Sequence, residues 1–141
     1  VLKAYFPKGE YIRLPAELPP NEVEALKDKE LQPAIAMLEI AVETQIGTDD
    51  RSAKEFAKGW MKGYSNNTFG EQGTIRTKDS YVGYRFYYVR PDGDKAGIAY
   101  FIRSRGNTKR VYRIAYIEAE ESDRGRKTFD NLLANLEFNT L

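Results

Sequence analysis

The stretch that decides the fold is YVGYRFYYVRPDGDKAGIAYFIRSRGNTKRVYRIAYIE, residues 81–118. It holds three runs rich in tyrosine, phenylalanine, valine and isoleucine, residue types that favour β-strands: 81–89, 97–103 and 111–118. Pro91 and Gly93 mark a hairpin turn after the first run, because proline presets its own φ and glycine accepts a positive one. Gly106 and Asn107 mark the tip of the next hairpin loop, residues 104–109. The stretch therefore predicts an antiparallel meander.

An amphipathic helix is predicted before the meander. Thr48, Asp49 and Asp50 favour a helix N-cap. Apolar residues then recur on one helical face: Ala53, Phe56, Ala57, Trp60 and Tyr64. Polar residues 65–67 end this helix, residues 70–73 are expected to form a loop, and residues 73–78 a short strand.

A second helix is predicted after the meander. Ser122 and Asp123 are its expected N-cap. Four apolar residues form the stripe that it should bury: Phe129, Leu132, Leu133 and Leu136. Both helices therefore need an apolar surface to cover, and the sheet provides it.

The N-terminal part of the chain gives weaker signals. Residues 11–14 predict a short strand that Pro15 ends, and residues 38–43 alternate apolar and polar side chains as a half-buried strand does. Residues 22–31 fit either a weakly amphipathic helix or one arm of a hairpin.

This order of elements predicts an α+β fold. Hairpin connections make the central sheet antiparallel, and the helices pack on its apolar faces. A chain of 141 residues has the length of one domain, so residues 1–141 are expected to form a single α+β domain.

The chain contains no cysteine and no histidine. Disulfides, thiol catalysis and the serine and cysteine hydrolase triads are therefore excluded, and so are the usual zinc ligands. An enzyme would need carboxylates, lysine or tyrosine for proton transfer. No glycine-rich phosphate loop follows a strand, and Asp92 and Asp94 lack the further oxygen ligands of a calcium loop, so no cofactor or metal is expected.

The charges are balanced, with 22 basic and 21 acidic residues. Basic residues do gather around one hairpin: Arg103, Arg105, Lys109, Arg110 and Arg113. Acidic residues 118–123 offset much of their field, and the strand at 84–89 lacks the glycine pattern of an RNA-recognition motif. We therefore expect no nucleic-acid partner.

The tyrosines are the candidate binding residues. Tyr84 and Tyr88 share one face of their strand, whereas Tyr81 and Tyr87 share the other, so both faces of the sheet are expected to be covered. Candidate ligand-binding residues are Tyr84, Tyr88, Tyr100, Tyr112 and Tyr116. The alternative interpretation, which we favour, is a core whose tyrosines reach solvent at its rim.

Residues 111–116, VYRIAY, are followed by an acidic turn, by FDNLL at 129–133 and by LEF at 136–138. This pattern resembles the PsbP-like family, named for an extrinsic protein of photosystem II. The resemblance covers residues 81–138, and the rest of the chain only by its order of elements. It implies an α/β/α sandwich with a central antiparallel sheet and a non-enzymatic binding or assembly role. It carries over no binding residue.

Because the chain begins at Val1, we expect that a signal peptide, a lipoprotein leader or a tag has been removed. This favours a periplasmic or secreted protein, with membrane tethering through a removed lipoprotein segment as one form.

The first hypothesis for function is a non-catalytic binding or assembly module with a protein partner. The alternative is a small-ligand carrier of cystatin-like helix-on-sheet fold, which a pocket of a few hundred cubic ångströms lined by Tyr84, Tyr100 and Tyr116 would favour.

Overall fold

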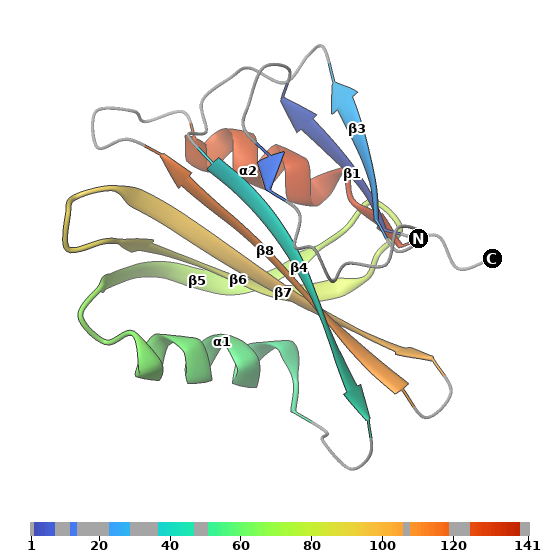
Figure 1. Ribbon diagram of the computed structural model, residues 1–141, viewed down its shortest axis with the longest axis horizontal. Helices are drawn as coiled ribbons and strands as arrows, with labels where there is room; N and C mark the ends of the chain where they lie inside the picture. Colours follow the sequence, from blue (N-terminus) through green and yellow to red (C-terminus); the bar gives the residue numbers. More distant parts are fainter. Residues whose placement is uncertain are drawn as a thin grey trace.

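The computed structural model describes residues 2–7, 12–13, 23–28, 37–46, 51–105, 108–118 and 125–138 (Figure 1). Side chains are described for residues 51–103, 109–118 and 125–138. The expected caps at 48–50 and 122–123, and the hairpin tip at 106–107, lie outside these residues.

A six-stranded sheet forms the centre of the fold. Its strands are β2 (Ile12–Arg13), β4 (Met37–Ile46), β8 (Thr108–Glu118), β7 (Lys95–Arg105), β6 (Val82–Val89) and β5 (Thr68–Arg76), in this spatial order. In this spatial order, β4, β8, β7, β6 and β5 each pair with the next strand in antiparallel register. At the other edge of this sheet, the short β2 pairs with β4 in parallel. The predicted antiparallel meander is confirmed.

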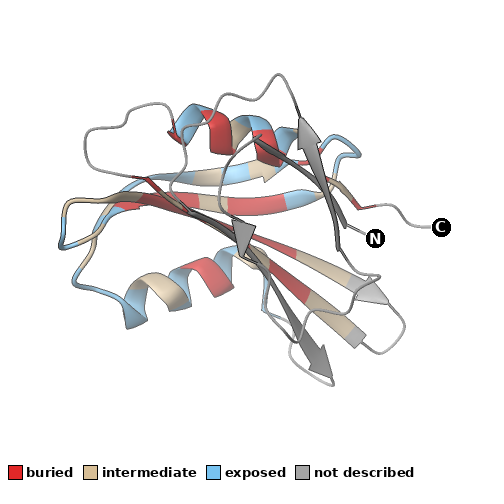
Figure 2. Ribbon diagram, turned by 45° about the horizontal axis from the view of Figure 1, so that its top comes forward, coloured by how far each residue is buried: buried red, intermediate tan, exposed pale blue. Residues whose placement is uncertain are grey.

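One helix packs on each face of this sheet (Figure 1). Helix α1 (Ala53–Gly63) packs on β6 and β7, and helix α2 (Gly125–Ala134) contacts β5, β7 and β8 on the opposite side. We call the two sides the α1 face and the α2 face. Figure 2 shows that burial concentrates where the helices meet the sheet and along the middle strands. The α+β class expected from the sequence is confirmed.

Side chains alternate between the two faces, as the pleat of a strand requires. On β6, Tyr84, Phe86 and Tyr88 belong to the core cluster under α1, whereas Tyr87 belongs to the cluster under α2. The predicted stripe is buried in full: Phe129, Leu132 and Leu133 lie in α2, and Leu136 lies just beyond its end. Burial of one such large side chain contributes about 1.5–3 kcal/mol relative to its exposure to water.

A second, three-stranded sheet was not predicted. It has the order β3 (Val23–Asp28), β1 (Leu2–Pro7) and β9 (Glu137–Phe138). Strand β3 resolves the ambiguity at residues 22–31 in favour of a strand, but it pairs in parallel with β1 and so is not a hairpin arm with its sequence neighbour.

Two local predictions were wrong. Residues 70–73 are not a loop, because β5 begins at Thr68 and crosses them with a β-bulge between Phe69 and Gln72. The N-cap of α1 is Ser52 rather than Thr48–Asp50. Ser52 and Glu55 form a capping box, in which each backbone N–H donates to the side chain of the other, at 3.1 and 3.2 Å.

The turns follow the expected chemistry. Gly93 has a φ of 91°, and its N–H donates to the Arg90 carbonyl oxygen at 2.9 Å. Tyr64, predicted on the buried face of α1, instead stands at the C-cap with 54% of its surface exposed, and its ring stacks on Trp60 at 4.5 Å.

Replacing Ser52 with alanine tests the capping box. Ser52→Ala leaves the Glu55 N–H without its side-chain acceptor, so the free energy of unfolding should fall by about 1 kcal/mol in a urea titration. Ser65→Ala, at an exposed turn position, is the matched control and should change it by less than about 0.5 kcal/mol. Equal effects of the two substitutions would contradict the role of the cap.

Candidate functional site

A row of three residues crosses the α2 face of the sheet. Tyr87 of β6 pairs with Gly97 of β7, and Gly97 pairs with Tyr116 of β8. Gly97 has no side chain, so the two tyrosine rings lean over it and meet edge to face, with centroids 6.2 Å apart. A Cβ at Gly97 would stand 2.6 Å from the Tyr116 ring and 3.0 Å from the Tyr87 ring.

Helix α2 covers one side of this row. Phe129 packs against Tyr116 with ring centroids 4.6 Å apart, and against Tyr87 at 6.5 Å. Glu118, two residues beyond Tyr116, is 1% exposed and accepts the N–H of Gly125 at 2.8 Å, which satisfies one of the free donors at the start of α2. A Cβ at Gly125 would overlap this carboxylate, which would then have to shift.

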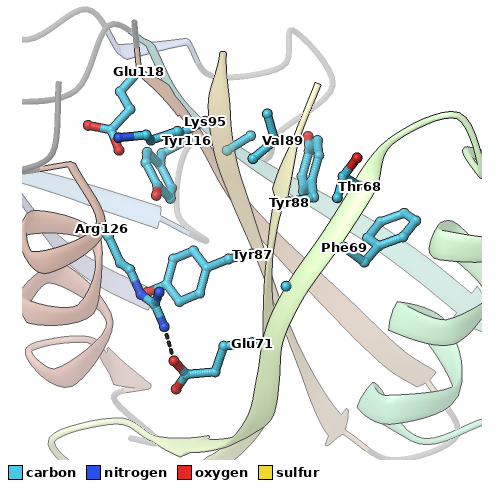
Figure 3. A pocket seen from close by; sticks show the side chains of 12 residues that line it. Thr68, Phe69, Glu71, Tyr87, Tyr88, Val89, Lys95, Tyr116, Glu118 and Arg126 are labelled. Carbon is cyan, nitrogen blue, oxygen red and sulfur yellow. Dashed lines mark hydrogen bonds and ion pairs between the residues drawn. The ribbon is translucent and has the colours of Figure 1, made fainter. Parts of the chain in front are cut away.

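Next to the row lies a cleft of about 330 Å³. It opens where the bulge of β5 interrupts the pairing with β6, and its lining side chains come from both faces of the sheet (Figure 3). The lining residues are Thr68, Phe69, Gly70, Glu71, Tyr87, Tyr88, Val89, Lys95, Ala96, Tyr116, Glu118 and Arg126. Most are aromatic or apolar, with two carboxylates and two basic side chains among them.

Charged side chains surround the Tyr87 ring. The Arg126 guanidinium lies 4.2 Å from the ring centroid and that of Arg85 lies 4.8 Å from it. The Tyr87 hydroxyl donates to Asp130, which also accepts from Arg85 at 2.7 Å. Glu71, on the bulge of β5, pairs with Arg126 and accepts from Arg85 at 3.4 Å. Strands β5 and β6 are thus tied to α2 by one network.

The tyrosines of the cleft stay protonated well into the alkaline range. Burial, and then the hydrogen bond to Asp130, raise the pKa of Tyr87. Burial, and then the charge of Glu118, raise the pKa of Tyr116, and burial also raises that of Tyr88. These phenols therefore act as neutral hydrogen-bonding groups.

The structure does not bring the five tyrosines expected to bind ligand together. Tyr84, Tyr88 and Tyr100 belong to the core on the α1 face, whereas Tyr112 and Tyr116 belong to the core on the α2 face. Only Tyr88 and Tyr116 line the cleft. Of the three tyrosines expected to line one pocket, only Tyr116 lines the cleft, whereas Tyr84 and Tyr100 pack in the core on the α1 face.

The other three expected tyrosines, Tyr84, Tyr100 and Tyr112, pack inside the fold. The Tyr84 hydroxyl donates to Gln72 at 2.8 Å and so ties β6 to β5. Tyr100 stacks against Phe56 at 6.0 Å, and Tyr112 is fully buried against Phe138.

Sequence reasoning missed Tyr87, Glu71, Lys95, Glu118 and Arg126. Tyr87 could have been found, since counting outward from the turn at Pro91 pairs it with Gly97. Glu71 could not have been found from the sequence. The glycines at 70 and 73 are typical of a loop, and the bulge that carries Glu71 forms only when β5 pairs with β6. For Lys95, Glu118 and Arg126 the sequence carries no signal that they share a site, because they come from three different elements.

A smaller hollow of about 180 Å³ lies beside Trp60, lined also by Tyr88, Ile98, Arg113, Ala115, Tyr116 and Ile117. Within the part of the chain that the structure describes, no three acidic side chains gather as a metal site, and neither helix is long and apolar enough to cross a membrane.

Gly97→Ala tests the packing under the two rings. The added Cβ forces them apart, so the free energy of unfolding should fall by about 1–3 kcal/mol. Gly59→Ala is the matched control: it lies in α1, a Cβ there meets nothing within 4 Å, and alanine favours a helix by about 0.5–1 kcal/mol. Urea titrations should therefore give opposite signs, and a stabilising Gly97→Ala would contradict the packing.

The raised pKa values predict a loss of stability at high pH. Above pH ~10 the tyrosines of the unfolded chain release protons, whereas folded Tyr87 and Tyr116 keep theirs. The folded state then binds more protons, so the free energy of unfolding falls as pH rises, by about 1.4 kcal/mol per pH unit for each such group. Below pH ~10 the effect is absent.

Urea titrations between pH 9 and 11 measure this slope. Tyr87→Phe should lower stability at pH 7 by about 1 kcal/mol, through the lost hydrogen bond to Asp130, and reduce the alkaline slope by about one proton. An unchanged slope in Tyr87→Phe would show that Tyr87 ionises normally in the folded protein.

No protein-family model matches this chain, and no curated protein matches its sequence. The geometry of the cleft is therefore the basis for the function proposed below.

Proposed function

We propose that this protein is a non-catalytic binding protein whose cleft holds a small amphipathic ligand. The observation that carries the proposal is the cleft of about 330 Å³ beside Tyr87 and Tyr116. Its volume is that of a site for a small organic molecule, and it combines an apolar lining with a few polar groups. This favours the small-ligand carrier over the assembly module, with Tyr87, Tyr88 and Tyr116 as the tyrosines that line the site.

The surroundings of the cleft favour binding over catalysis. Asp130 accepts hydrogen bonds from the Tyr87 hydroxyl and from Arg85, and Glu118 accepts the first N–H of α2, so these groups hold the fold together. The phenols with raised pKa remain protonated at neutral pH and are poor general bases.

We also propose the finer assignments that the sequence suggested. A helix on each face of an antiparallel sheet supports a PsbP-like α/β/α sandwich. The extracytoplasmic location remains a proposal from the sequence and would be tested by fractionating cells that express the native gene.

An assembly role is the second candidate. It is favoured by β5, which ends the spatial order of the sheet and is exposed at Thr68, Gln72 and Thr74. An edge strand of this kind can pair with an extended segment of a partner. This role requires no small ligand.

A neutral fluorescent probe tests the cleft. N-phenyl-1-naphthylamine brightens on entering an apolar site, and we expect saturable binding to the protein. Val89 lines the cleft and is partly exposed, so Val89→Trp should obstruct the site and weaken binding about tenfold or more. Val82 is similarly exposed on the same strand but does not line the cleft, so Val82→Trp should bind as the parent does.

Equal affinity in the two tryptophan variants, or a probe signal that does not saturate, would contradict the proposed function. In that case the edge of β5 becomes the better candidate, and the assembly role replaces the carrier.

A further inference from the structure

We propose that the ligand of the cleft carries a carboxylate, which replaces Glu71 on the guanidinium of Arg126. This inference rests on the proposed function and adds the chemical class of the ligand. In the free protein, the Glu71 carboxylate occupies the place that the carboxylate of the ligand takes on binding (Figure 3).

Arg126 is held ready for a carboxylate. Its guanidinium lies 4.2 Å from the centroid of the Tyr87 ring. Cation–π contact on the flat face leaves the N–H groups at the edge of the guanidinium to bind an anion. Arg126 is also the second residue of α2, where the helix dipole favours negative charge.

The ion pair between Arg126 and Glu71 is easily exchanged. The two side chains are 46% and 60% exposed, so water competes with the contact and the pair is held weakly. Glu71 also stands in the bulge of β5, where the ladder with β6 is interrupted. Displacing it breaks no backbone pairing.

Glu71 has a second partner when it leaves Arg126. Its other carboxylate oxygen already lies 3.4 Å from Arg85. The Nε of Arg85 is buried and has no hydrogen-bond partner among the described residues, so Arg85 has a donor to spare. A ligand carboxylate can therefore take Arg126 while Glu71 stays paired with Arg85.

The cleft offers the ligand a further donor. Tyr116 lines it, is 2% exposed, and its hydroxyl forms no hydrogen bond with the residues whose side chains are described. The carboxylate of Glu118, by contrast, already accepts from Gly125. The Tyr116 hydroxyl can therefore donate beside the Arg126 guanidinium, which suits an acidic ligand with an apolar body set against Tyr87, Tyr116 and Val89.

The test compares two probes of the same shape. 2-Naphthoate and 2-naphthalenemethanol differ in charge, and each is titrated against bound N-phenyl-1-naphthylamine as a displacement assay. We expect naphthoate to bind about tenfold more tightly than the alcohol, as one charge-assisted hydrogen bond allows. Amide shifts of ¹⁵N-labelled protein should place both probes at residues of the cleft.

Three variants assign the effect to the ion pair. Arg126→Gln should weaken naphthoate about tenfold and leave the alcohol unchanged. Glu71→Gln removes the competing carboxylate and should tighten naphthoate several-fold, a gain that a misfolded protein cannot give. Lys127→Gln removes an exposed charge of the same helix that does not line the cleft, and should change neither affinity.

The outcomes separate the two proposals. Equal binding of the two probes at the cleft, or tighter binding of the alcohol, overturns the acidic ligand but leaves the carrier function standing. Displacement by neither probe, while N-phenyl-1-naphthylamine still binds at the cleft, also overturns the acidic ligand alone. Only absence of N-phenyl-1-naphthylamine binding at the cleft overturns both. Weaker naphthoate binding in Glu71→Gln would show that Glu71 holds the site together and is not displaced.

Discussion

Burial of aromatic rings on both faces of β6, β7 and β8 is the constraint on which the rest of the structure depends. Strand β6 sends Phe86 to the α1 face and Tyr87 to the α2 face, and neither ring can stay in water without a large loss of stability. Each face therefore requires a cover, and each receives one amphipathic helix. The two helices lie far apart in the sequence, with the four strands β5 to β8 between them.

The cleft lies where the start of α2 meets the bulge of β5. Helix α2 begins at Gly125, held against Glu118, and Arg126 of its first turn lies over the Tyr87 ring. Beyond it, the bulge of β5 replaces a regular strand edge with Gly70 and the exposed Glu71. Apolar surface and charged groups then meet at one place. A continuous ladder at β5 would have left a plain sheet edge there.

Much of the fold could be predicted, because its signals are local. The alternation in residues 81–118, the turn at Pro91 and Gly93 and the apolar stripe of α2 each depend on a short stretch of chain. The N-cap of α1 was misplaced by two residues because Asp50 and Ser52 are both good caps, and only the capping box with Glu55 distinguishes them.

The site could be predicted much less well. Glu71, Tyr87 and Arg126 come from three elements and meet only through the register of β5 on β6 and the seating of α2. Tyr84, Tyr100 and Tyr112 were expected at the site only because they are tyrosines. The alternation of side chains along each strand places them in the cores on the two faces of the sheet. The second sheet was missed because parallel pairing of β1 with β3 leaves no turn signal between them.

That second sheet has a mechanical consequence. Leu2 pairs with Phe138 and Lys3 with Glu137 in antiparallel register, so a force that draws these two segments apart loads one pair at a time. Such an arrangement opens like a zipper at low force. Between β4, β8 and β7 of the central sheet, each pair of strands has ten or more paired residues, so the contact of β1 with β9 is the mechanically weaker one.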